Sequence, residues 1–310
     1  MKFYLQTVLC LLSLAAPIAF SADLDAFPSR EALLAPAPNA AWNQFSTAPD
    51  HYGTYEIASG VYLFVYRGTN GLFMVTDDGV IVVDPISEAG APKFLAAIRA
   101  ITDAPIKYLV YSHWHWDHIE GGQVFKDAGA KIIAHEKCIA PLIDLPNDKI
   151  VMPDEVFYGT HTINLGGRSL ELLYLGPNHT SCLVFPKPDN VNALFIVDLL
   201  TPGGSPLATW TDYIPHHWVR TLREIEAMDL DFIMSGHAVP VAHPSAVTER
   251  RRYVETLIDS VRTANERGLG GKERVAYVRE QLEPLSHLRN FGIYLDNHVG
   301  RISTYLATGW

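Results

Sequence analysis

A short string of metal-seeking side chains constrains this chain more than any other feature. Residues 112–122 read SHWHWDHIEGG and place four ligand-type residues within six positions: His113, His115, Asp117 and His118. The string directly follows the apolar run IKYLVYS (106–112), which predicts a buried strand. A strand end is rigid, so the turn after it can direct several side chains to one point. Imidazoles and carboxylates together suit zinc, with iron and manganese as alternatives.

Four ligand-type residues cannot all hold one tetrahedral ion and leave a position open for a reactant. A second metal needs further ligands, and three later candidates each follow an apolar, strand-like run. The three candidates are His179 in LELLYLGPNHTS, Asp198 in ALFIVDLL and His237 in DFIMSGH. Taken singly, each is equally a loop histidine or a strand-end aspartate. Taken in order, they extend the first string to a set large enough for two metals.

With these motifs the sequence resembles the metallo-β-lactamase superfamily of metallohydrolases. Asp84 in VVDP supplies the first of five motifs, and the resemblance runs from about residue 55 to about residue 240. It implies an α/β fold, a four-layer αβ/βα sandwich of two mostly antiparallel mixed sheets with outer helices. The site is then expected at one edge, between the sheets.

The resemblance also implies two metal ions per chain, expected to be zinc, with iron or manganese as alternatives. The ligands implied for the first metal are His113, His115 and His179. Those implied for the second metal are Asp117, His118 and His237. Asp198 is expected to bridge the two metals.

Two acidic residues have further expected roles. Asp117 is the catalytic residue, because a carboxylate beside a metal can hold the attacking water and accept its proton. Asp84 is expected to orient ligands or water through hydrogen bonds. The alternative for Asp84 alone is a plain Asp-Pro turn that ends a strand.

The sequence departs from the family pattern in ways that bear on the substrate. Asn178 and Val197 stand where glycine is usual, and Glu120 is inserted before the glycine pair. Asp198 occupies a position that is Cys in many familiar lactamases of the superfamily. A bridging carboxylate is the pattern of the broad hydrolase branch, which includes lactonases and thioesterases, and it weakens a specific β-lactamase assignment.

The expected function is an exported binuclear hydrolase. A metal-bridging hydroxide would attack an ester, thioester, lactone or β-lactam bond of a small-molecule substrate. One alternative is a mononuclear iron oxidoreductase of sulfur compounds on the same fold, which the full set of seven ligand positions disfavours. The other is a non-catalytic metal-binding protein, which has no need of the whole set.

Candidate substrate contacts are weaker predictions, and for the tryptophans packing is the default interpretation. The four candidates are Trp114, Trp116, Asn178 and His216. The YRGTNG hairpin tip (66–71) and residues 201–213 are expected to form the rims of the site, because loops on a rigid scaffold usually set substrate choice.

The composition limits the partners. The chain carries 24 Lys and Arg against 34 Asp and Glu, a net charge of −10, without a basic cluster. Nucleic acid and anionic membrane surfaces bind mainly through Lys and Arg, so neither is expected as a partner. The sequence leaves a homo-oligomer open.

Four regions follow from the pattern along the chain. Residues 1–21 predict a cleaved signal peptide, because Lys2 precedes an apolar stretch and Ala19-Phe20-Ser21 fits a cleavage site. The mature protein is therefore expected in the periplasm or secreted. An Ala/Pro-rich arm (22–52) leads into the catalytic region (53–243), and residues 244–310 predict a helical extension of the same domain.

Several local features are predicted as well. Asn70-Gly71 and Asp78-Gly79 are expected to form hairpin turns, and SCLVF (181–185) a strand. The helices are expected at 91–102, 118–128, 136–144, 215–228, 245–267, 272–283 and 290–307. In an oxidising compartment Cys138 and Cys182 have the option of pairing, but two separate buried thiols is the favoured interpretation.

Overall fold

The structure, a computed structural model, describes residues 52–206 and 213–309 of the chain. The predicted signal peptide and all but the last residue of the predicted arm lie outside the described residues, as do residues 207–212 of the predicted rim. Among the described helices, none combines the length and apolarity needed to cross a bilayer.

A seven-stranded sheet forms the first layer, with its strands in sequence order. The strands are β1 (Tyr52–Ala58), β2 (Val61–Tyr66), β3 (Thr69–Thr76), β4 (Gly79–Val83), β5 (Ile106–Tyr111), β6 (Lys131–His135) and β7 (Glu155–Phe157). The first four pair antiparallel through short turns. The pairs from β4 to β7 are parallel, because helical crossovers separate β4, β5 and β6.

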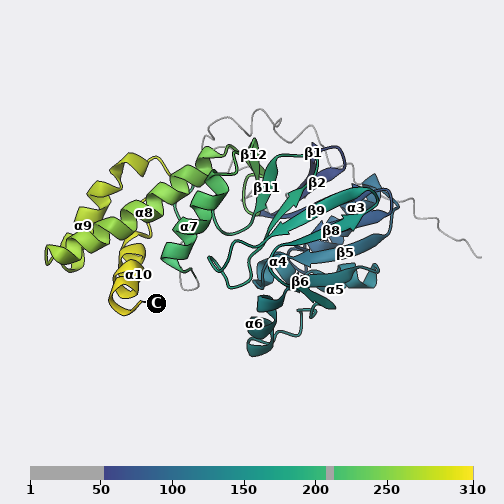
Figure 1. The fold of residues 1–310 in the computed structure, drawn as a ribbon, viewed down its shortest axis with the longest axis horizontal. Helices are drawn as coiled ribbons and strands as arrows, with labels where there is room; N and C mark the ends of the chain where they lie inside the picture. The colour runs from purple at the N-terminus through teal and green to yellow at the C-terminus, as the bar shows by residue number, and fades with distance from the viewer. Residues whose placement is uncertain (1–51, 207–212, 310) are drawn as a thin grey trace, which may run out of the picture.

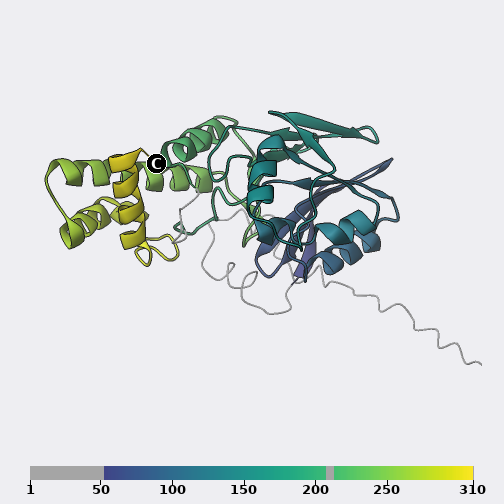
Figure 2. The same cartoon turned by 90° about the horizontal axis from the view of Figure 1, so that it is seen from below.

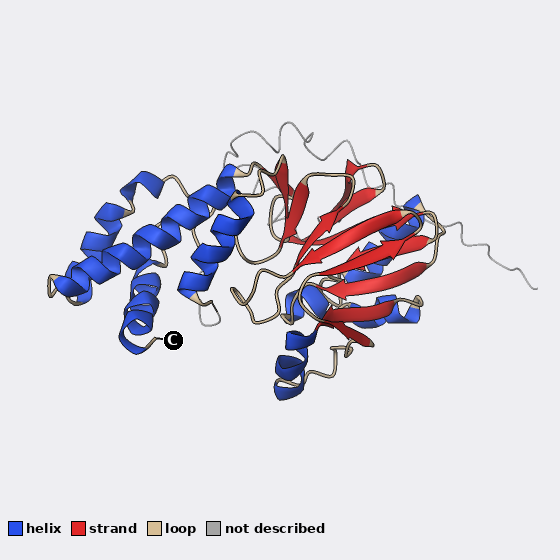
Figure 3. Ribbon diagram, in the orientation of Figure 1, coloured by secondary structure: helices blue, strands red, loops and turns tan. Residues whose placement is uncertain are grey.

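Two three-stranded sheets form the second layer and face the first (Figures 2 and 3). One consists of β8 (His161–Leu165), β9 (Arg168–Leu173) and β10 (Phe185–Pro188). The other consists of β11 (Ala193–Ile196), β12 (Phe232–Ser235) and β13 (Val241–Ala242). Strand β10 contacts β11, so the two sheets continue one another.

Helices cover the layers and extend to one side (Figure 1). Beside the first sheet lie α3 (Ala91–Ile101), α4 (Trp116–Ile119), α5 (Gly122–Asp127), the 3₁₀ turn η2 (Glu136–Cys138) and α6 (Ile139–Asp144). The others are α7 (Pro215–Glu226), α8 (Ser245–Glu266), α9 (Gly271–Gln281), η3 (Glu283–Leu285) and α10 (Leu295–Thr308). This architecture is the predicted αβ/βα sandwich.

Two apolar cores hold these layers together. One lies between the first sheet and its helices, where the rings of Phe64 and Phe94 stack 4.7 Å apart. The other fills the space between the sheets, with Leu63 and Phe195 fully buried. It continues without a break to buried side chains of α8 and α10. The helical extension therefore shares buried apolar surface with the sandwich.

Some local predictions were wrong. Asn70-Gly71 lies inside β3, and the hairpin turns three residues earlier, where Arg67 and Gly68 adopt positive φ. The predicted strand 181–185 begins only at Phe185. Strands β7 and β13 were not predicted, because they are too short to show a pattern.

The predicted helix 118–128 is divided into α4 and α5. The division falls at Gly121, whose N–H donates to the carbonyl of Ile86 at 2.8 Å. A Cβ on Gly121 would lie 2.5 Å from the Ala91 side chain and 2.5 Å from the Pro85 carbonyl oxygen. Close approach to the 84–86 segment requires a glycine here, and the helix breaks at that point.

Cys138 and Cys182 form a disulfide, so the favoured interpretation of two separate thiols was wrong. Cys138 ends η2 after the first-layer strand β6, whereas Cys182 lies just before β10 of the second layer. The bond therefore connects the two layers. Spacing alone did not show the pairing, because it depends on how the two sheets face each other.

Removing the disulfide is expected to destabilise the fold. It closes a loop of 44 residues, and the lost constraint on the unfolded chain costs about 2–4 kcal/mol. The Cys138→Ala/Cys182→Ala variant should therefore unfold at a lower urea concentration, as measured by circular dichroism. An unchanged midpoint would contradict a stabilising role for the bond.

Candidate metal centre

Every predicted ligand lies just beyond the end of a strand, on the edge where the two layers meet. The 113–118 turn follows β5 of the first sheet, and His179 lies in the loop between β9 and β10. Asp198 and His237 follow β11 and β12, which are parallel neighbours. Because parallel strands place their carboxyl ends at one edge, segments far apart in sequence converge here.

Three histidines and one carboxylate form the first ligand group. His113 Nε2 lies 3.1 Å from Asp198 Oδ2, and His179 Nε2 lies 3.2 Å from the same oxygen. His115 Nδ1 lies 3.6 Å from it and 2.9 Å from His179 Nε2. The ligand atoms of these four residues all lie within 4.8 Å of one another.

The second ligand group consists of Asp117, His118 and His237, again with ligand atoms within 4.8 Å of one another. The Nε2 atoms of His118 and His237 are 3.0 Å apart. Asp117 Oδ2 lies 3.4 Å from the first and 3.7 Å from the second. The Asp117 side chain is 54% exposed, so it faces the open side of the site.

Asp198 lies between the two groups. While Oδ2 faces the first group, Oδ1 lies 2.5 Å from His237 Nε2. Oδ2 is also 3.4 Å from His118 Nε2. One carboxylate therefore contacts both sets of histidines, which is the placement of a bridging ligand.

The donor set fits divalent cations. His113 Nε2 is buried without a hydrogen-bond partner, although Asp198 is near. Burial lowers the pKa of His113 well below its usual value, so this imidazole is neutral and has a lone pair to give. Ring nitrogens only 3.0 Å apart repel one another unless a proton or a cation lies close to both. Histidine and carboxylate donors at this spacing suit two zinc-like ions.

The negative charge in the site also favours a cation. Burial by itself would lower the pKa of His118, but the carboxylates of Asp117 and Asp198 raise it well above its usual value. The same field acts on any positive species, and a dication responds to it more strongly than a proton does.

Asp84 fixes the turn that carries the first string of ligands. Its Oδ1 accepts from the Ser112 N–H at 2.8 Å, and its Oδ2 accepts from the Ser112 hydroxyl at 2.7 Å. His118 Nδ1 lies 3.3 Å from Oδ2, and Ser112 Oγ lies 3.0 Å from His113 Nδ1. Asp84 thus contacts His118 directly and contacts His113 through Ser112. Ser112 was not singled out from the sequence, although it directly precedes the string.

A buried asparagine fastens the turn that carries His237. The Asn70 side chain donates to the Ser235 carbonyl at 2.8 Å, and its backbone N–H donates to Gly236 at 2.8 Å. His237 Nδ1 lies 3.2 Å from the Gly68 carbonyl oxygen. The tip of the β2–β3 hairpin therefore contacts a ligand directly. In the sequence, Asn70-Gly71 is typical of a hairpin turn, so the contact of Asn70 with the His237 turn was not predicted.

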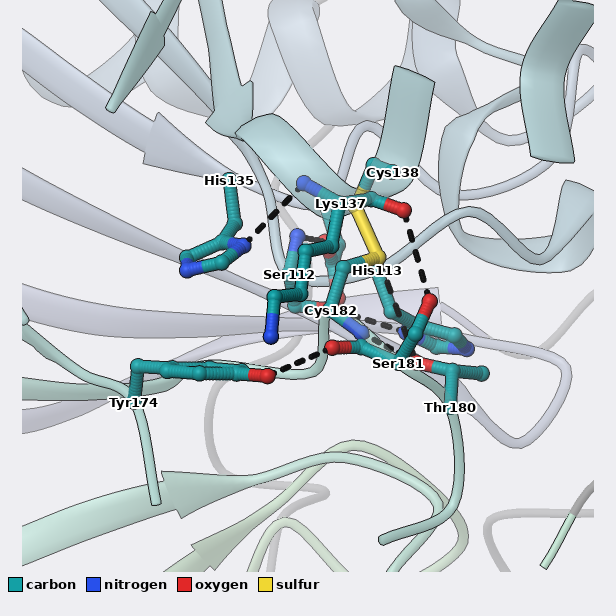
Figure 4. The surroundings of a disulfide bond; sticks show 10 residues. Ser112, His113, His135, Lys137, Cys138, Tyr174, Thr180, Ser181 and Cys182 are labelled. Atoms are coloured by element: carbon teal, nitrogen blue, oxygen red, sulfur yellow. Dashed lines mark hydrogen bonds between the residues drawn. A yellow bond between two sulfur atoms is a disulfide. The ribbon is translucent and has the colours of Figure 1, made fainter. Parts of the chain in front are cut away.

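The His179 loop has no regular structure but is held on several sides (Figure 4). The disulfide anchors it at Cys182, and the Tyr174 hydroxyl donates to the Ser181 carbonyl at 2.8 Å. Asn178 is fully buried and accepts from the His179 N–H at 2.5 Å. Asn178 therefore shapes the loop. Its side chain is fully buried, whereas a substrate contact was predicted.

The three remaining candidates for substrate contact differ in their exposure to solvent. The Trp114 ring packs against the first core, 4.5 Å from the ring of His115, which agrees with packing as its default role. Trp116 is 44% exposed beside Asp117. His216 is exposed, and its Nδ1 lies 2.9 Å from the Tyr305 hydroxyl of α10. Of these two tryptophans, Trp116 is the more exposed.

Comparison with known proteins finds a matching family, related sequences and related structures. A family model described as "Metallo-beta-lactamase superfamily" matches residues 66–237, more than half of the chain. The α subunit of 2,4-dinitroanisole O-demethylase from Nocardioides sp. (strain JS1661) is 26% identical over 213 residues, which are 65% of this chain and 60% of that protein. A linear primary-alkylsulfatase from Pseudomonas sp. (strain ATCC 19151) is 24% identical over 278 residues, covering 73% of this chain and 52% of its own length.

The chain thus spans between half and two thirds of the length of these two relatives. Among solved structures, a metallo-beta-lactamase from Pontibacter korlensis superposes with a TM-score of 0.58 at 19% identity. The match covers 66% of this chain and 99% of that structure. At this identity the likeness shows a shared fold.

Replacing Asp84 by Asn should weaken metal binding without removing a ligand. Asparagine tolerates the positive φ of 55° at this position, but its amide cannot accept from Ser112 through both former carboxylate oxygens. Losing such a supporting contact typically lowers metal affinity about 10–100-fold. Zinc affinity is measured by competition with a chelator. Asp189→Asn, which removes a carboxylate paired with Arg168, serves as the control. Equal affinities in both variants would contradict a role for Asp84.

Proposed function

Because the chain belongs to the metallo-β-lactamase superfamily, we propose that it is an exported binuclear metal-dependent hydrolase, with zinc as the metal. The observation that carries this proposal is the position of the Asp198 carboxylate. Its two oxygens contact the histidines of both ligand groups. A site for a single ion has no need of that bridge.

The chemistry follows from the donor set and its exposure. Divalent metals bound by these residues would lower the pKa of water and polarise the oxygen of the bond to be cleaved. Asp117 is suited to accept a proton from the attacking water, because its carboxylate lies beside His118 and His237 and is also open to solvent. In the first group, His113 and His179 are buried and therefore shield one side of the site from water.

The proposed substrate is a small molecule with an ester, thioester, lactone or β-lactam bond. Asp198 at the bridging position favours the broad hydrolase branch over a dedicated β-lactamase. The exposed Trp116 next to Asp117 supports a substrate with an apolar part near the cleaved bond. The names of the relatives add an alkyl sulfate and an aryl methyl ether to the compounds worth testing.

The proposal is tested with purified, metal-loaded protein in two measurements. Elemental analysis should find about two zinc ions per chain, and hydrolysis should be detected for at least one member of a panel of these substrate classes. About one iron per chain would support sulfur oxidation on the same fold instead. Two bound metals without turnover of any compound would support a metal-binding protein.

Substitution of the ligands should separate metal binding from folding. His113→Ala is expected to abolish turnover, and Asp198→Asn to lose much of the affinity for the second metal, because each removes a donor from the set. Both should keep the wild-type circular dichroism spectrum. His287→Ala, at an exposed histidine beside Glu249, is the control and should keep full activity. Unchanged turnover in His113→Ala would contradict the assignment.

Export is supported by the predicted signal peptide together with the disulfide, since such bonds persist mainly in oxidising compartments. Cell fractionation should recover the protein in the periplasm or medium, shortened at its N-terminus by about 21 residues. Full-length protein in the cytosol, with Cys138 and Cys182 reactive to a thiol reagent after denaturation, would rule out export.

A further inference from the structure

Residues in and just before α7 hold the backbone around Asp198. Asp198 adopts a left-handed conformation with φ of 56°, which aspartate visits more readily than most residues with a side chain. Its carbonyl oxygen accepts a hydrogen bond from the Tyr213 hydroxyl. The next carbonyl, that of Leu199, accepts from the Trp218 indole N–H at 2.8 Å. Two aromatic donors thus fix successive peptide groups of this turn.

The same two aromatic residues are packed against each other and against a ligand. The rings of Tyr213 and Trp218 lie 4.0 Å apart, and Trp218 is fully buried. The Tyr213 ring also lies 4.5 Å from the ring of His179. Tyr213 therefore touches one ligand through its ring and a second through its hydroxyl.

The helical extension holds this pair in turn. Arg301 of α10 donates to the backbone carbonyl of Tyr213 at 3.1 Å. The guanidinium of Arg250, in α8, lies 5.5 Å from the Trp218 ring centre and donates to Gly204 at 3.1 Å. Burial lowers the pKa of Arg250 to about 10, so this group still carries its charge near neutral pH.

The extension itself is firmly attached to α7. Arg251 of α8 pairs with Glu226 of α7 at 2.6 Å, and Arg223 of α7 pairs with Glu255 of α8 at 2.7 Å. Farther from the site, the Tyr253 hydroxyl and His298 Nδ1, 2.9 Å apart, join α8 to α10. Movement at the Tyr213 contact is thus resisted by the packing of three helices.

We propose that Tyr213 is a positioning residue for Asp198, and that α8 and α10 hold Tyr213 in place for this purpose. This inference rests on the proposed metal-dependent function. A bridging carboxylate serves two metals only when its orientation is fixed closely, and the turn that carries Asp198 has no regular structure of its own to fix it. The Tyr213 hydroxyl supplies the missing restraint.

The test compares two variants that each lose one buried tyrosine hydroxyl. Tyr213→Phe keeps the ring against Trp218 and His179 but releases the Asp198 carbonyl. Its zinc affinity, measured by chelator competition, should fall about 10–100-fold, and the absorption spectrum of the cobalt-substituted protein should change. Tyr253→Phe makes the same chemical change within the extension, without contact to the ligands. It should lower the melting temperature but keep wild-type zinc affinity and cobalt spectrum.

A third variant tests the link to the extension. Arg301→Leu removes the donor to the Tyr213 backbone and should weaken zinc binding in the same direction, by less than Tyr213→Phe. Wild-type zinc affinity in Tyr213→Phe, or an equal loss in Tyr213→Phe and Tyr253→Phe, would overturn this inference and leave the proposed function standing. A wild-type protein that binds no zinc would overturn both.

Discussion

One carboxylate, whose side chain is 13% exposed, organises the edge of the molecule that carries the candidate ligands. Asp198 contacts ring nitrogens of five histidines: His113, His115, His118, His179 and His237. Withdrawing so many polar groups from water is unfavourable unless each finds a partner, and hydrogen bonds among acceptor nitrogens cannot satisfy them all. Two cations can, because each imidazole then gives its lone pair to a positive charge.

Residues from distant segments of the chain hold the candidate ligands in position. Asp84 holds the 113–118 turn, Asn70 holds the His237 turn and the disulfide at Cys182 anchors the His179 loop. Tyr213 completes the pattern at Asp198. Each support comes from a different element, and the support at Asp84 acts on the turn that carries four of the seven candidate ligands.

That these seven side chains lie together could be predicted from the sequence, and most of the contacts that support them could not. A ligand at a strand end has a local signature, an apolar run followed by His or Asp, and this signature recurs at His113, His179, Asp198 and His237. The partner of Asn70 lies 165 residues away, and that contact depends on how the two layers face each other. Two sheets with outer helices were predictable because strand and helix periods are local, and the αβ/βα sandwich followed from the resemblance to the family. Gly121 broke a helix for a tertiary reason, its close approach to the 84–86 segment.

The three kinds of contact at this edge all connect the first layer to the second. The ligand set joins the β5 turn to the turns after β11 and β12, the disulfide joins η2 to the loop before β10, and Asn70 joins β3 to the turn after β12. Metal binding would therefore be coupled to the packing of the sheets, because ions at this site would bind the native arrangement and not the unfolded chain. The disulfide and Asn70 connect the two layers through contacts that do not involve the candidate ligands. The ligands then need little rearrangement, and more of the binding energy appears as affinity.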